Sequence, residues 1–157
     1  MAEQSILEMS IENGSTQPAA IERCLTFDSG DLTMFISTEY VTEIINNQSI
    51  TYLPLLPPFI KGIINLRGQI LPVVDIRLYM GKPETVYDSH TCIIVLNVNS
   101  ISLGIIVDSV QKVVDIDLNQ VHPIPLKRQQ KLLNGMIKME SGKVLMSFDS
   151  EALATGY

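Results

Sequence analysis

Residues 62–76 read GIINLRGQILPVVDI and form the most apolar stretch of the chain. Branched aliphatic residues, which are typical of strands, dominate on both sides of Arg67, Gly68 and Gln69. Glycine readily adopts the positive φ that a tight turn between two strands needs. The stretch therefore predicts a β-hairpin with Arg67 close to its tip.

Shorter strand-like segments lie on both sides of this hairpin and are separated by turn residues. They are residues 24–28, 32–37, 43–45, 91–97, 101–107, 110–116, 136–139 and 143–148. Short helical turns are expected at residues 39–41, at 126–133 with an end at Asn134-Gly135, and at 150–154. Because strands do not alternate with helices, a doubly wound parallel sheet is disfavoured. The pattern predicts an all-β fold, in which one closed barrel or two would remove the exposed strand edges.

The length and composition are those of a folded protein. With 157 residues, of which 46% are hydrophobic and 18% charged, the chain can bury a core as one domain or as two small, tightly joined halves. Residues 1–20 are polar and mixed in character. We therefore expect a flexible leader over residues 1–20 and a single domain over residues 21–157.

The charge of the chain argues against one class of partner. A net charge of −6 does not suit nucleic-acid binding, and the densest basic piece, Lys127, Arg128 and Lys131, is interrupted by two glutamines.

The N-terminus lacks the features of a secretory signal, and no apolar run is long enough to insert into a membrane. By elimination we expect a cytoplasmic protein. Cys24 and Cys92 are interpreted as apolar core residues, with a disulfide left open.

Motifs that carry catalysis or metal binding are missing from the sequence. It contains no phosphate-binding glycine loop, nucleophile elbow or zinc-protease motif, and only two histidines. His90 and Cys92 fall on one strand face, but a zinc site needs about four ligands. Asp108, Asp115 and Asp117 are interpreted as solvated side chains rather than as a cation site. We therefore expect no enzymatic activity, no metal and no cofactor.

Two charged residues stand out in the apolar part of the chain. Arg67 lies between strong strands, and Glu43 precedes Ile44-Ile45. They are either a turn arginine and a solvated glutamate, or anchors of a partner-binding surface, where arginine is enriched. Asp75 and Arg77 share one face of the expected strand and are placed to pair with each other.

Residues 59–77, FIKGIINLRGQILPVVDIR, resemble the hallmark of CheW-like domains. The family pattern is Gly, two apolar residues, Asn-Leu-Arg-Gly, three residues, Pro, two apolar residues and Asp-Leu-Arg. This sequence departs from the pattern with Ile76 in place of the usual leucine. Supporting stretches are residues 41–44, 93–97 and 104–110, and the resemblance covers about residues 22–155.

The resemblance implies two SH3-like, five-stranded β-barrels packed on a shared hydrophobic core, with short helices. It also implies an adaptor without catalysis or cofactor. Proteins of this family bind the cytoplasmic tip of chemoreceptors, the methyl-accepting chemotaxis proteins. They also bind the regulatory domain of the histidine kinase CheA, and the result is a cytoplasmic signalling array at the membrane receptors.

The resemblance also assigns roles to individual positions. Positions tied to receptor contact match Val41, Glu43, Gly62, Arg67 and Cys92. Positions linked to kinase binding match Gly68, Gly104 and Val110. Asn65 and Asp75 match the motif as structural residues, Cys92 replaces an apolar residue, and Phe35 replaces a residue that is small in some relatives. On these assignments, Arg67→Ala should lose receptor coupling with an intact fold, and Gly104→Asp should weaken kinase binding by a steric block.

Other readings remain open from the sequence. The chain would equally suit a paralogue in another receptor–kinase pathway, such as motility or surface sensing. It would also suit a piece of the kinase itself or of a coupling protein fused to a receiver domain, although Met1 and the short leader favour a free-standing protein. A small β-barrel enzyme or ligand binder would need a pocket with converging polar groups, and the sequence shows no such cluster.

Overall fold

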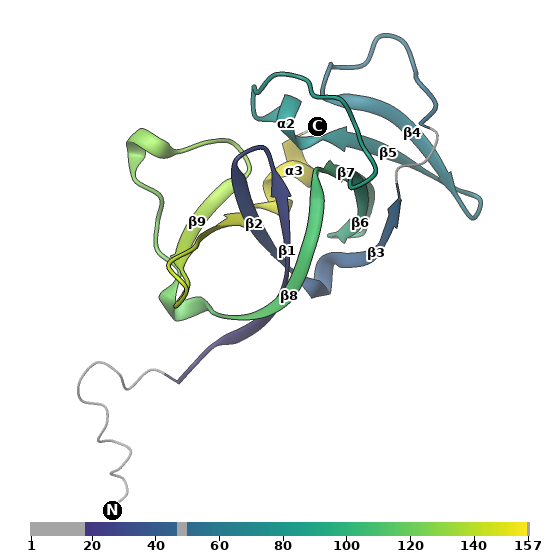
Figure 1. Ribbon diagram of the computed structural model, residues 1–157. Helices are drawn as coiled ribbons and strands as arrows, with labels where there is room; N and C mark the ends of the chain where they lie inside the picture. The colour runs from purple at the N-terminus through teal and green to yellow at the C-terminus, as the bar shows by residue number, and fades with distance from the viewer. Residues whose placement is uncertain (1–17, 47–49, 157) are drawn as a thin grey trace, which may run out of the picture.

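The computed structural model describes residues 18–46 and 50–156, so most of the expected leader lies outside the described residues. These residues form two five-stranded sheets (Figure 1). Sheet one contains, in spatial order, β8 (Ser109–Asp117), β1 (Ile21–Ser29), β2 (Leu32–Ser37), β10 (Val144–Phe148) and β9 (Leu133–Lys138). Sheet two contains β3 (Val41–Asn46), β6 (Cys92–Val98), β7 (Ile101–Val107), β5 (Gln69–Asp75) and β4 (Ile60–Leu66). The expected all-β class is confirmed.

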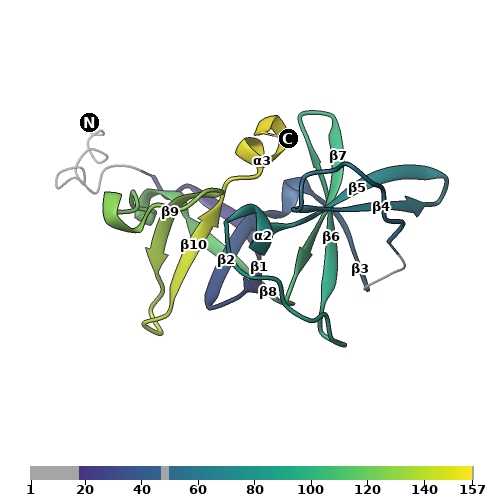
Figure 2. The same ribbon diagram turned by 90° about the horizontal axis from the view of Figure 1, so that it is seen from above.

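The chain visits sheet one twice. It builds β1 and β2, crosses to sheet two for β3 to β7, and returns for β8 to β10. The helices are short: η1 (Thr38–Tyr40), α2 (Ile76–Tyr79), η2 (Leu118–Gln120), η3 (Leu126–Arg128) and α3 (Ser150–Gly156). Seen from above, the two sheets lie side by side, with α2 and α3 between them (Figure 2). Within the described ranges, no helix has the length and apolarity that a membrane crossing requires.

Short bridges join the outer strands of each sheet. Thr51, which follows β3, exchanges two backbone hydrogen bonds of 2.8 and 3.0 Å with Ile63 of β4. His122, which follows η2, exchanges two of 2.8 Å with Met136 of β9. These contacts cover part of the strand edges, which suits the expected barrel shape.

Three apolar clusters fill the fold. One lies within sheet one and another within sheet two, and the largest takes residues from both sheets. Strand β6 shows how: Ile93 and Val95 enter the cluster of sheet two, while Ile94 and Leu96 enter the shared cluster. Successive side chains of a strand point to opposite faces, so a strand buried on both sides needs a continuous apolar run. The expected shared core is confirmed.

Two local expectations were wrong. The strand expected through Ile76 ends at Asp75, because the Asp75 carboxylate accepts hydrogen bonds from the backbone N–H groups of Arg77 and Leu78 and caps α2. Asp75 and Arg77 therefore do not pair through their side chains.

The second wrong expectation concerns the segment before the last hairpin. Residues 126–133 were expected to be helical up to Asn134-Gly135, but the 3-10 helix stops at Arg128 and β9 begins at Leu133. A β-carbon on Gly135 would lie 2.7 Å from Cγ1 of Val121. This glycine is thus explained by close strand packing rather than by a helix end.

Candidate functional site

The β4–β5 hairpin ends in a two-residue turn made of Arg67 and Gly68. Their φ angles are +52° and +88°, the left-handed region that tight hairpin turns use. The Asn65 side chain accepts a hydrogen bond of 2.8 Å from the Gly68 N–H, which agrees with a structural role for Asn65. Holding a residue other than glycine in this conformation costs about 1–2 kcal/mol. Arginine is therefore not the residue that turn stability alone would favour at this position.

We expect Asn65→Ala to lower the free energy of unfolding by about 0.5–1.5 kcal/mol, because it removes the acceptor that closes the turn. Urea denaturation followed by circular dichroism measures this loss. Asn65→Asp keeps an acceptor oxygen at the same position and should recover most of the stability. An equal loss in both variants would contradict the role of this hydrogen bond.

Arg67 pairs with Glu43 of strand β3. Both terminal guanidinium nitrogens face the carboxylate, with Nη1 to Oε2 at 3.4 Å and a shorter contact from Nη2 to Oε1. The hydrogen bond and the charge of Glu43 raise the pKa of Arg67. The pair joins β3 to the β4–β5 turn, and β3 and β4 are the two outer strands of sheet two. The Arg67 side chain remains 70% exposed, so it still presents N–H donors to solvent.

The other residues expected to contact a receptor fall into two groups. Val41 and Cys92 lie toward opposite ends of the β3–β6 ladder, and both pack, half-buried, against the shared core. Gly62 is buried in β4, and a β-carbon there would lie 2.1 Å from the backbone oxygen of Thr51. Gly62 thus presents no side chain to a partner, and the structure gives it a packing role.

The residues expected to bind a kinase are also dispersed. Gly68 is exposed beside Arg67 in the turn. Gly104 is buried in β7, where a β-carbon would lie 2.7 Å from Cγ2 of Ile93. Val110 is half-buried in β8, and its backbone faces the Cys92 thiol. The two expected surfaces therefore meet at Arg67–Gly68 and at Cys92–Val110.

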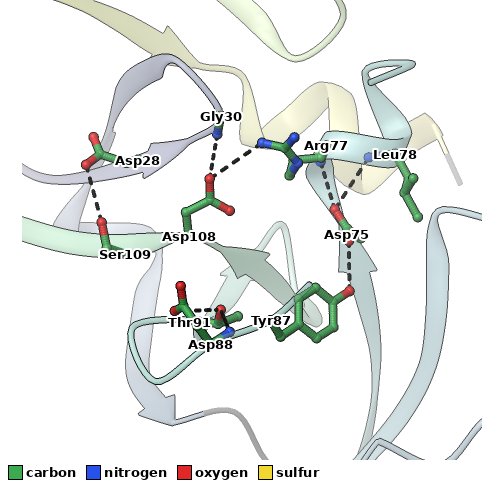
Figure 3. Close-up of polar contacts among 10 residues, drawn as sticks. All are labelled: Asp28, Gly30, Asp75, Arg77, Leu78, Tyr87, Asp88, Thr91, Asp108 and Ser109. Carbon is green, nitrogen blue, oxygen red and sulfur yellow. Dashed lines mark hydrogen bonds and ion pairs between the residues drawn. The ribbon is translucent and has the colours of Figure 1, made fainter. Parts of the chain in front are cut away.

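A set of buried polar contacts beside α2 was not predicted from the sequence (Figure 3). The Asp75 carboxylate is 1% exposed and caps α2 with one oxygen. Its other oxygen accepts a hydrogen bond of 2.8 Å from the Tyr87 hydroxyl. Burial, and secondarily Asp75, raises the pKa of Tyr87 well above its usual range. Asp75 thus ties the long β5–β6 connection to sheet two, which agrees with its expected structural role.

Arg77 links the two sheets. Its Nη1 lies 3.5 Å from Oδ2 of Asp108, at the point where the chain returns to sheet one. The same oxygen accepts a hydrogen bond of 2.7 Å from the N–H of Gly30, in the β1–β2 turn. Asp108 is therefore not a freely solvated acid, as the sequence suggested. No spacing rule could have found this pair, because its members are brought together only by the crossing of the chain.

The described residues contain no group of three metal-ligating side chains close enough to hold an ion. Both cysteines are free thiols. Cys24 is buried within sheet one, and burial, followed by the charges of Glu22 and Asp115, raises its pKa to about 11. Burial likewise raises the pKa of Cys92. Neither thiol has the lowered pKa of a reactive cysteine.

The Cys24 thiol predicts a pH dependence of stability. Its pKa rises from an ordinary 9.0 to about 11 in the folded state, so the folded protein holds this proton more tightly than the unfolded chain does. The resulting stability is complete below pH 9.0 and is lost as the pH rises towards about 11. Urea denaturation should show a steeper loss over this interval for the wild type than for Cys24→Ala. Parallel curves for the two proteins would contradict the prediction.

Comparisons with known proteins show which family the chain resembles. The family model of the CheW-like domain matches residues 23–156. The chain is 37% identical to "Chemotaxis protein CheW" of Klebsiella aerogenes over 101 residues, which cover 64% of this chain and 61% of that protein. It is 28% identical to the protein of the same name from Bacillus subtilis, over 84% of this chain and 86% of that protein.

A solved structure is also similar. The scaffolding protein TtCheW of Thermoanaerobacter tengcongensis superposes with a TM-score of 0.76 at 29% identity, over 82% of this chain and 89% of that chain. The family match includes the β4–β5 hairpin, the Arg67–Glu43 pair and all described strands except the first two residues of β1. This chain therefore belongs to the CheW-like domain family.

Proposed function

We propose that this protein is a non-catalytic chemotaxis adaptor, which couples chemoreceptors to the histidine kinase CheA in a cytoplasmic signalling array. The observation that carries the proposal is the exposed Arg67 at the tip of the β4–β5 turn. It is held in a left-handed conformation and is paired with Glu43 within a CheW-like fold. Strained residues persist where the surrounding structure fixes them, and they concentrate at functional positions.

The exposed guanidinium of Arg67 suits contact with a helix of a receptor tip. A carboxylate on the helix would accept charge-assisted hydrogen bonds from it. Glu43 orients Arg67 for this contact. We assign receptor binding to the Glu43–Arg67 pair together with Val41 and Cys92.

We assign kinase binding to the turn at Gly68 and to the Val110 region of β8. Gly62 and Gly104 enter this proposal only as residues that shape the backbone, since both are buried. Because the proposed receptor and kinase surfaces touch, one partner can influence the placement of the other. Individually weak contacts of this kind gain strength when many copies assemble in an array.

The test is titration calorimetry of the purified protein with a receptor-tip fragment and, separately, with the CheA regulatory domain. Arg67→Ala removes the charged donors and is expected to weaken receptor binding roughly 10- to 100-fold. Kinase binding should change less than about threefold, a shift of under 1 kcal/mol. Alanine leaves the strain of the turn unchanged, and the ion pair that is lost is exposed on the arginine side, so thermal unfolding should change little.

Arg23→Ala is the matched control. Arg23 is an exposed arginine of β1 that pairs with Asp115 in sheet one, so the substitution makes the same change of charge away from the hairpin. It should leave both affinities unchanged. Unaltered receptor binding by Arg67→Ala would contradict the proposed anchor. Failure of the wild type to bind CheA would assign the protein to a different receptor–kinase pathway.

A further inference from the structure

We propose that residues 1–17, the N-terminal segment, dock into a groove on sheet one of the same chain. The groove has a volume of about 530 Å³ and lies against the β1–β2 turn, η3, β9 and β10. Its rim is basic and its floor is apolar, whereas the N-terminal segment combines acidic with apolar residues. The inference is independent of the Arg67 surface and of the proposed adaptor function.

Three cationic side chains line the rim of the groove. Lys127 and Arg128 belong to η3, and Lys82 follows α2. Of the described residues that line the groove, Asp31 alone is acidic. Within the described part of the chain, no ion pair involves any of the three cations. The groove is therefore a positive surface on a chain with a net charge of −6, and it favours an acidic occupant.

The floor of the groove is the outer edge of the shared core. Leu32, Met136 and Met146 pack half-buried against the shared cluster, and Ile124, which is 7% exposed, belongs to it. Methionine side chains are flexible and adapt to irregular partners, so they are frequent at binding surfaces. The occupant that suits this groove therefore carries apolar side chains as well as carboxylates.

The N-terminal segment has this composition. It reads MAEQSILEMSIENGSTQ and contains three glutamates but no Lys, Arg or His. Its larger aliphatic residues lie among the glutamates, at Ile6, Leu7, Met9 and Ile11. Three carboxylates can thus pair with the three cations of the rim, while the aliphatic side chains cover the floor.

The groove lies within reach of the N-terminal segment. The backbone oxygen of Pro18, where the described chain begins, accepts a hydrogen bond of 2.9 Å from the Asn119 side chain. Ile124 of the groove follows Asn119 by five residues, which limits the distance between their Cα atoms to about 18 Å. An extended chain covers about 3.3 Å per residue, so Met9 can lie about 30 Å from Pro18. The acidic and aliphatic part of the segment is therefore long enough to enter the groove.

The tether favours this segment over a separate molecule as the occupant. An exposed ion pair contributes little by itself, and three of them make only a weak contact. A short tether, however, holds a segment at an effective concentration in the millimolar range. A second copy of the chain, or a partner with a similar acidic segment, would need a comparable concentration to displace it.

The experiment follows methionine methyl groups of the full chain by NMR, because methionines lie on both sides of the proposed contact. We expect NOE cross-peaks between the methyl group of Met9 and those of Met136 and Met146, which line the groove. Met139 is the internal control, since it is also half-buried but packs against the separate cluster of sheet one. It should give no cross-peak with Met9.

Removing the charge of the segment should release it. The variant carries Glu3→Gln, Glu8→Gln and Glu12→Gln, and its docking equilibrium constant should fall about 3- to 100-fold, the range for three exposed ion pairs. The cross-peaks should weaken accordingly, and the methyl signals of the groove should shift. Salt at about 1 M reduces the screening length to about 3 Å and should have the same effect on the wild type.

A charge swap tests whether the cations of η3 are the partners. Lys127→Glu with Arg128→Glu should abolish the cross-peaks, and adding Glu8→Lys with Glu12→Lys should restore them.

The matched control is Lys112→Glu with Lys138→Glu, which changes two exposed lysines of sheet one outside the groove. It should leave the cross-peaks intact. Equal loss in this control, failure of the charge swap to restore docking, or unchanged groove signals in the neutral variant would overturn the proposal. Cross-peaks that weaken on dilution would also overturn it, because they would show that the segment binds a second copy of the chain.

Discussion

Gly104→Asp is expected to destabilise the whole domain by at least about 4 kcal/mol, rather than to block a single interface. Gly104 is buried in β7 between Val95 of β6 and Val73 of β5. A side chain there enters the apolar cluster of sheet two, 2.7 Å from Cγ2 of Ile93 at its first carbon. An aspartate would place an unpaired carboxylate in this cluster. Domains are stable by only about 5–15 kcal/mol, so the variant should be largely or partly unfolded at room temperature.

Urea denaturation by circular dichroism measures the loss, with Gly104→Ala as the control. Alanine adds a methyl group but no charge, and it should cost about 1–3 kcal/mol as Ile93 moves aside. If Gly104→Asp instead unfolds within about 2 °C of the wild type, a shift that for this size corresponds to under 1 kcal/mol, the burial argument fails. Loss of kinase binding by such a stable variant would then make Gly104 a true contact residue.

Gly62→Ala is expected to cost about 3 kcal/mol or more, because two effects add. The φ of Gly62 is +147°, a conformation that residues with a β-carbon rarely adopt. The new methyl group would also lie 2.1 Å from the backbone oxygen of Thr51. That oxygen accepts the hydrogen bond of 3.0 Å from Ile63, so it cannot retreat without breaking the bridge across the edge of sheet two.

Gly142→Ala separates the two effects. Gly142 has a φ of +91°, in the β9–β10 turn, but a β-carbon there meets nothing within 4 Å. It should therefore lose only about 1 kcal/mol, the cost of the backbone conformation alone. Thermal or urea unfolding of the three proteins gives the comparison. Equal losses at the two glycines would show that the contact with Thr51 is not decisive.

These outcomes change how a variant at either glycine is interpreted. A substitution at Gly62 or Gly104 that weakens receptor or kinase binding does so first by destabilising the fold. Arg67, in contrast, is exposed and lies in a turn, so its side chain can be removed without opening the core. Binding experiments are therefore best interpreted at Arg67, with stability measured alongside.

The β4–β5 hairpin could be predicted because its signals are local. Branched residues flank a turn that contains Gly68. The Asn65 side chain accepts a hydrogen bond from the N–H of Gly68, only three residues later. The end of β5 was missed because Asp75 is both the last strand residue and the cap of α2. Residues that serve two elements give no clear periodic signal.

The site was predictable only in part, for the same physical reason. Glu43 and Arg67 could each be singled out as charges among apolar residues, but their pairing depends on how β3 meets the hairpin. The burial of Gly104 depends on β6 and β5 lying on either side of it.

Hydrophobic alternation, turn residues and the 62–76 motif therefore determined the all-β class, most strand positions and the family resemblance from the sequence alone. Each of these three signals lies within a short stretch of neighbouring residues. Only the tertiary structure decided that the chain visits sheet one twice, that Arg77 bridges to Asp108, and which glycines are buried. Those features join residues that are distant in the chain, and they arise when burial of the shared core brings the two sheets together.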